Sequence, residues 1–165
     1  MERLPSQEPR WLRITIPASA VTFIFALFIA AVFQPNIRLL HALQALIYVA
    51  VIILARRDSA WGYGAGCFIS GAWNFMYIKG TVGPIWDLIT GRLFRPDLVI
   101  VLLAVVAHFC LMIACIAAFL RLAPPSKRWI KFLAGGFLTL AYFVLIIVTA
   151  APPYVVPLLK KVLGF

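Results

Sequence analysis

Five stretches of this sequence, each 17 to 23 residues long, contain no Lys, Arg, Asp or Glu, and they restrict the possible folds more than any other feature. A helix rises 1.5 Å per residue, so these stretches would extend over about 25 to 35 Å, close to the hydrocarbon thickness of a bilayer. They cover residues 14–33, 39–55, 60–78, 98–120 and 132–151. We therefore predict a single all-α integral membrane domain, a bundle of five transmembrane helices, with a bundle of four as the alternative.

The composition indicates that lipid is the solvent for this chain. Hydrophobic residues make up 64% of the sequence and charged residues 12%, whereas soluble domains contain about 45–50% and about 25%. Such a chain cannot cover itself with polar surface, so we expect the lipid bilayer as its partner. The net charge of +10 does not indicate nucleic-acid binding, because the basic residues form short clusters between the apolar stretches, as they do beside lipid headgroups.

The distribution of basic residues predicts the orientation. Nine of the fifteen Lys and Arg lie before the first stretch and in the second and fourth connections, on one side of a five-helix bundle. The positive-inside rule then places the N-terminus in the cytoplasm and the C-terminus outside, in the plasma (inner) membrane of the cell. A signal peptide is the alternative for the first stretch, but 20 apolar residues are long for one, so we expect an uncleaved helix.

The third stretch carries small residues at a spacing of four. Gly62, Gly66 and Ser70 share one helix face, and Asn74 continues it. Small residues allow helix backbones to approach closely, which is how helices associate in lipid. We predict a helix-packing face, through which another membrane protein could bind. The leading hypothesis for function is therefore a non-catalytic structural or accessory subunit that packs through this helix.

Residues 79–97 contain several glycines and prolines, and we predict a loop there with a short interfacial segment. Trp86 favours the membrane surface, and the candidate functional residues of this loop are Trp86, Asp87, Arg92 and Arg95. The end of the chain, 152–165, has apolar residues on one side and lysines on the other. This pattern is typical of a brief interfacial helix.

Six polar residues fall inside the predicted spans, and such residues are often functional. They are His41, Gln44, Tyr48, Ser70, Asn74 and His108. Counted from the predicted outer surface at the helical rise, Asn74 lies about 6 Å deep, Tyr48 about 14 Å and His108 about 15 Å. Hydrogen bonds that only fix the packing would explain them. The alternative hypothesis for function is a small-molecule binder or transporter with an outward-facing pocket lined by these residues.

Catalytic and metal sites have little support in the sequence. A membrane enzyme, the third hypothesis, would depend on Asp87 and Asp97 near His41. Haem held by two histidines would require His41 and His108 at similar depth, yet they differ by about 12 Å. The three cysteines form no C-x-x-C pair and no set with zinc spacing. We therefore expect no catalytic residues, no metal and no cofactor.

Overall fold

The computed structural model describes residues 9–92, 94–121, 127–153, 157 and 160, and within them the side chains of all but 78–80. The described residues form five long helices and one short 3-10 helix, and they contain no strand. The helices are α1 (Arg10–Phe33), η1 (Pro35–Ile37), α2 (Arg38–Ala55), α3 (Ala60–Ile89), α4 (Pro96–Arg121) and α5 (Lys127–Ala150).

Four of these helices are long and apolar enough to cross a membrane. They are α1, α2 together with η1, α4 and α5. The central helix α3 contains more glycine and polar residues and does not reach the same hydropathy. The all-helical fold predicted from the sequence is confirmed, as are four helices of spanning length.

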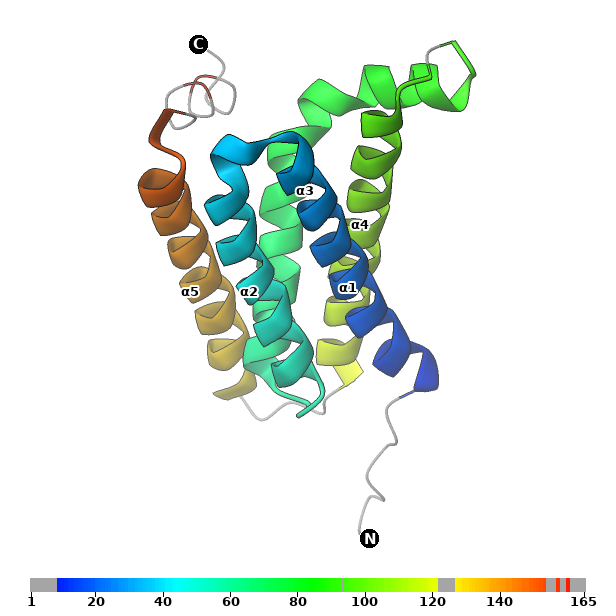
Figure 1. Cartoon of the computed structure of the whole chain (residues 1–165). Helices are drawn as coiled ribbons and strands as arrows, with labels where there is room; N and C mark the ends of the chain where they lie inside the picture. Colours follow the sequence, from blue (N-terminus) through cyan, green and yellow to red (C-terminus); the bar gives the residue numbers. More distant parts are fainter. Residues whose placement is uncertain (1–8, 93, 122–126, 154–156, 158–159, 161–165) are drawn as a thin grey trace, which may run out of the picture.

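The helices run alternately up and down, so α1 begins and α5 ends at opposite ends of the bundle (Figure 1). Helix α3 packs against α2, α4 and α5, while α1 packs against α2 and α4. We call the end that contains η1 and the start of α4 the η1 end. The opposite end, with the start of α1 and the turn between α2 and α3, is the basic end.

Glycines bring the backbones of α3 and its neighbours close together. A Cβ atom on Gly62 would lie 2.6 Å from the Cβ of Leu54 on α2, and one on Gly66 would lie 2.6 Å from the sulfur of Cys115 on α4. Ser70, next on this face, is fully buried. The face predicted to pack therefore does pack, but against helices of the same chain. A partner could reach it only by separating those helices.

The loop predicted for residues 79–97 is wrong in its first half, because α3 continues to Ile89. Gly83 and Pro84 both lie within α3, so neither residue ends the helix here. The end comes at Gly91, whose φ of +71° is a conformation that glycine adopts without strain. The Arg92 N–H donates to the Asp87 carbonyl at 2.8 Å, and the Gly91 N–H donates to the Leu88 carbonyl at 3.2 Å. These two bonds are the Schellman motif.

The same motif ends α2, but without a glycine. The Ser59 N–H donates to the Leu54 carbonyl at 3.1 Å and the Asp58 N–H to the Ala55 carbonyl at 2.9 Å. Asp58 takes the left-handed position, with φ +49°. Aspartate tolerates this conformation better than most residues, although less well than glycine. Its carboxylate accepts a hydrogen bond of 3.1 Å from the Tyr63 hydroxyl, which ties the turn to the first turns of α3.

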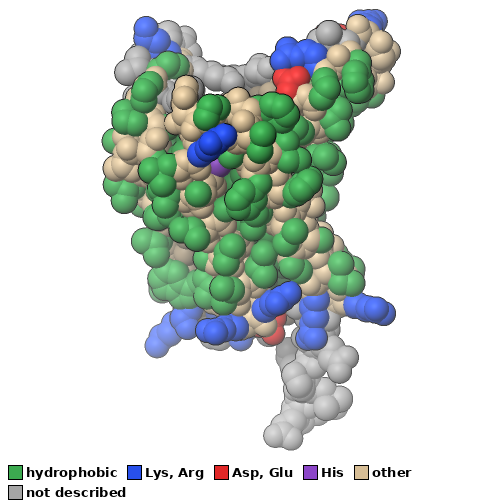
Figure 2. Space-filling model, in the orientation of Figure 1, with side chains coloured by type: hydrophobic (Ala, Val, Ile, Leu, Met, Phe, Trp, Pro, Cys, Tyr) green, Lys and Arg blue, Asp and Glu red, His purple; other side chains and the backbone are tan. Residues whose placement is uncertain are grey.

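Side chains on the surface follow the pattern of a membrane protein. Figure 2 shows a broad apolar band across the visible face of the bundle, with Lys and Arg gathered toward its two ends. Many large apolar side chains point outward from this band, including Phe25, Phe28 and Ile113, each about 60% exposed. The interfacial tail predicted for residues 152–165 lies mostly outside the described residues.

Candidate functional site

A fully buried imidazole lies at the centre of the bundle. His108 of α4 has no exposed surface, and side chains from three other helices surround it. Phe23 comes from α1, Tyr48 from α2 and Trp73 from α3. We call these four residues the His108 cluster. The cluster joins four helices at one level of the bundle.

Hydrogen bonds define the tautomer of His108. Its Nδ1 lies 2.8 Å from the carbonyl oxygen of Ala104, which can only accept, so Nδ1 carries the proton. Its Nε2 carries no proton and therefore accepts a hydrogen bond of 2.7 Å from the Tyr48 hydroxyl. Both nitrogens are satisfied with the imidazole neutral, which is the form that a dry interior favours.

Aromatic rings close the remaining sides of the imidazole. The indole of Trp73 stacks on it, with ring centroids 4.4 Å apart and planes 10° apart. Phe23 meets it edge to face at 3.9 Å, and Phe23 also contacts Tyr48 at 4.6 Å. No side of His108 is left open to a ligand. A metal or haem iron could bind His108 only by displacing Tyr48 or the Ala104 carbonyl, so the His108 cluster is suited to fixing the register of four helices.

Three other buried polar side chains have no such partners. Both amide atoms of Asn74, the hydroxyl of Ser70 and Nδ1 of His41 are buried and make no hydrogen bond with any described residue. Asn74 is 7% exposed and Ser70 is 0% exposed. An unpaired buried polar group costs about 1–3 kcal/mol, so native proteins usually provide it with a partner or an ordered water. Each of these four atoms is therefore a position where a further donor or acceptor would relieve that cost.

Asn74 and His41 lie on the η1 side of the His108 cluster, whereas Ser70 precedes Trp73 on α3 and so lies toward the basic end. Asn74 directly follows Trp73 and is one turn beyond Ser70 on α3, while His41 is about two turns beyond Tyr48 on α2. His41 also borders a cavity of about 200 Å³ between α1 and α2. At its rim, Nε of Arg38 donates to the Ala31 carbonyl at 2.9 Å. The cavity is lined by Leu27, Phe28, Ala31, Arg38, His41 and Ala42.

The structure thus separates the six polar residues predicted to share a pocket. Tyr48 and His108 contact each other and are satisfied, whereas His41, Ser70 and Asn74 are buried and unpaired. Gln44, one turn from Tyr48, is 8% exposed and also lies in the interior. Phe23 and Trp73 were not predicted, because single aromatic residues in an apolar stretch are common. For Trp73, the sequence did offer one signal: Tyr77 follows four residues later on the same helix face, and the two rings stack with centroids 4.2 Å apart.

The loop candidates lie elsewhere, at the η1 end. Trp86 and Asp87 are on the last turns of α3, with Trp86 60% exposed, and Arg92 is exposed in the connection that follows. Arg95 donates two hydrogen bonds to Asp97, one of them 3.1 Å long. This pairing lowers the pKa of the Asp97 carboxyl and raises the pKa of the Arg95 guanidinium. Both side chains are exposed, so the pair stabilises the start of α4 only slightly.

Among the described residues, no group of three or more His, Cys, Asp or Glu side chains could hold a metal ion. No protein-family model, no characterised protein and no solved structure matches the chain.

Proposed function

We propose that the chain is an integral protein of the inner membrane with five spans, its N-terminus in the cytoplasm and its C-terminus outside. Four helices have the length and apolarity of spans, and α3 packs among three of them. The basic end carries most of the described Lys and Arg, which favours the cytoplasmic side. These residues are Arg10, Arg13, Arg56, Arg57, Arg121, Lys127, Arg128 and Lys131.

We further propose that the protein binds a small uncharged polar molecule between the His108 cluster and the outer surface. The observation that carries this proposal is Asn74, whose amide nitrogen and oxygen are both buried without a partner. An amide offers two donors and an acceptor, and Ser70 and His41 add a hydroxyl and an imidazole nitrogen. These groups match the hydrogen bonds of a neutral ligand. A charged ligand would also need a counter-charge in the apolar interior.

The test compares small molecules that remain bound to purified variants. Wild type, Asn74→Leu and Thr139→Val would be purified in mild detergent, and bound molecules would be extracted and identified by mass spectrometry. Thr139 is the matched control, because it is polar and lies in a helix, but its hydroxyl already donates to the Gly135 carbonyl at 2.8 Å. We expect one molecule in wild type and Thr139→Val that is absent from Asn74→Leu. Identical extracts from all three variants would contradict the proposal.

An accessory subunit is the second candidate function, through a different surface from the face on α3. An apolar groove of about 500 Å³ runs between α2 and α5. Its floor includes Ala65 and Gly135, small residues that would admit an apolar helix of another membrane protein. This candidate predicts a stoichiometric protein partner in a gentle purification and loss of that partner in Ala65→Leu. The enzyme hypothesis based on Asp87 has no supporting contact among the described residues.

A further inference from the structure

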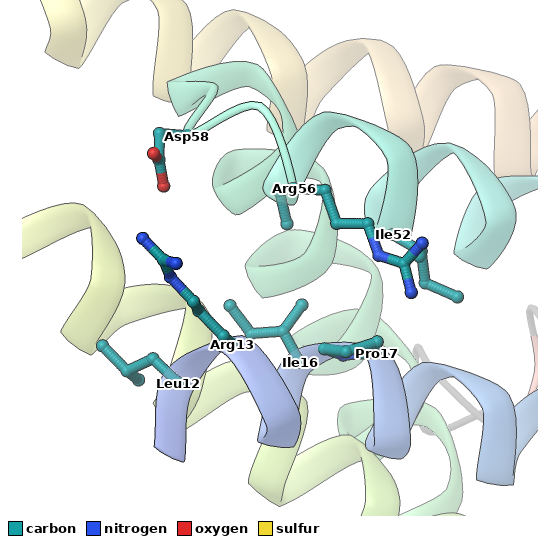
Figure 3. A pocket seen from close by; sticks show the side chains of 8 residues that line it. Leu12, Arg13, Ile16, Pro17, Ile52, Arg56 and Asp58 are labelled. Atoms are coloured by element: carbon teal, nitrogen blue, oxygen red, sulfur yellow. The ribbon is translucent and has the colours of Figure 1, made fainter. Parts of the chain in front are cut away.

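A second cavity, of about 390 Å³, lies at the basic end between α1 and the end of α2 (Figure 3). Its floor is apolar, because Leu12, Ile16 and Ala55 are less than 8% exposed. Charged side chains form its rim, Arg13 from α1 and Arg56 and Asp58 from the end of α2 and the turn. An apolar floor with a charged rim is suited to an amphipathic ligand.

The rim has two different sides. Figure 3 shows Arg13 and Asp58 pointing toward one another, whereas the guanidinium of Arg56 points away from both, beside Ile52. Among the described residues, the Arg56 side chain makes no hydrogen bond or ion pair. The cavity therefore has an excess of positive charge, and the donors of Arg56 are available on the side of the rim where Ile52 provides apolar surface.

The position of the cavity suggests which amphipathic molecule fits. At the end of a membrane bundle, a charged rim lies at the depth of lipid headgroups and an apolar floor lies at the depth of acyl chains. Arginine binds phosphate oxygens with paired N–H donors. The rim of the cavity itself carries two arginines and one aspartate, which makes it more attractive to anionic lipids than to neutral ones.

We infer that this cavity binds an anionic glycerophospholipid, with its phosphate at Arg56 and an acyl chain along Ile16, Pro17 and Ile52. The inference rests on membrane insertion of the bundle, as proposed above, and does not depend on a ligand at Asn74. Pro17 lies inside α1 and lines this side of the cavity, where its ring offers apolar surface.

The experiment is native mass spectrometry of the full chain in mild detergent, with phosphatidylglycerol or phosphatidylethanolamine added. We expect wild type to bind the first phosphatidylglycerol about 5-fold more tightly than phosphatidylethanolamine, since one basic side chain near the surface contributes a preference of this size. Arg56→Gln should remove the preference. Arg57→Gln is the matched control, because Arg57 is the next exposed arginine but does not line the cavity, and it should keep the preference.

Three results would overturn the inference. Equal losses in Arg56→Gln and Arg57→Gln would mean that the lipid responds to diffuse surface charge. Displacement of the lipid by excess inorganic phosphate would mean that the cavity takes a free phosphate. Unchanged phosphatidylglycerol binding in Ile52→Trp, which fills the apolar part of the cavity, would place the acyl chain elsewhere. If wild type shows no preference for phosphatidylglycerol while topology reporters still show membrane insertion, this inference fails and the proposed membrane topology stands.

Discussion

At the scale of single residues, the interior of this bundle separates satisfied from unsatisfied polar groups. His108 and Tyr48 complete each other's hydrogen bonding in a site that neither water nor lipid reaches. The Asn74 amide, only one residue from the stacked Trp73, has no hydrogen-bond partner among the described residues. In an apolar interior this difference is large, because an unpaired group keeps its full desolvation cost. The paired residues therefore fix the helix packing, and the unpaired ones are the basis of the proposal that the protein binds a small polar molecule.

Replacing Tyr48 by Phe tests the structural role of the His108 cluster. The change removes only the hydroxyl and leaves Nε2 of His108 buried without a donor, so we expect the free energy of unfolding to fall by about 1–3 kcal/mol. Unfolding in mild detergent, followed by tryptophan fluorescence, measures it. Tyr142→Phe is the control, because the Tyr142 hydroxyl makes a longer bond of 3.4 Å at a half-buried position. Equal losses in the two variants would argue against a special role for the Tyr48–His108 pair.

Asn74→Leu makes a second prediction at this scale. In protein stripped of bound small molecules, removal of an unpaired amide should raise the free energy of unfolding by about 1–3 kcal/mol. The same variant should lose any stabilisation that the native small-molecule extract gives to wild type. Thermal unfolding with and without the extract separates the two effects. If Asn74→Leu destabilises the stripped protein, then the amide has a partner within the bundle and the binding proposal loses its basis.

At the scale of elements, α3 is the helix on which the bundle depends, and its glycines differ in their surroundings. A Cβ atom on Gly64 would collide with the backbone of Phe132 on α5, whereas one on Gly83 would meet nothing within 4 Å. Contacts of this kind, between helix backbones, are typical of association in lipid.

The two glycines therefore give a matched pair of predictions. Gly64→Ala should force α3 and α5 apart and lower the free energy of unfolding by about 1–3 kcal/mol, the usual cost of overpacking. Gly83→Ala should be neutral or stabilise by up to about 1 kcal/mol, because alanine is the better helix former. Comparing the unfolding midpoints of both variants with wild type checks this, and a tolerated Gly64→Ala would show that α3 and α5 are not in close contact.

The turn between α2 and α3 gives a prediction about its backbone. Asp58→Gly and Asp58→Ala both lose the hydrogen bond from Tyr63, so their difference reports only the left-handed conformation at position 58. We expect the glycine variant to be more stable by about 1 kcal/mol, since alanine has a Cβ that disfavours this conformation. Equal stability would show that the turn relaxes when the carboxylate is removed.

The sequence predicted much of the helical fold but less of the site. Apolar stretches locate helices well, and the predicted starts and ends of the four spans differ from the helices by at most five residues. The continuation of α3 was missed because Gly83 and Pro84 are helix-breaking in water, although the helix contains both. Equal depth suggested that Tyr48 and His108 could meet. The rotation of each helix about its own axis was not predictable, so the roles of Phe23 and Trp73 emerged only from the structure.

At the scale of the whole molecule, we propose that α3 crosses the membrane together with the other four helices. Five spans would place the two chain termini on opposite sides of the membrane, and a spanning α3 would bring Ser70 and Asn74 inside the bilayer. Two reporter proteins show on which side of the membrane a position lies: alkaline phosphatase is active only outside the cytoplasm, and green fluorescent protein is fluorescent when it folds inside. Each reporter would be fused after Phe165 and, in a second set of fusions, within the turn at Arg57. We expect phosphatase activity after Phe165 and fluorescence at Arg57. Fluorescence at both positions would mean an even number of crossings between Arg57 and Phe165, and would contradict a spanning α3.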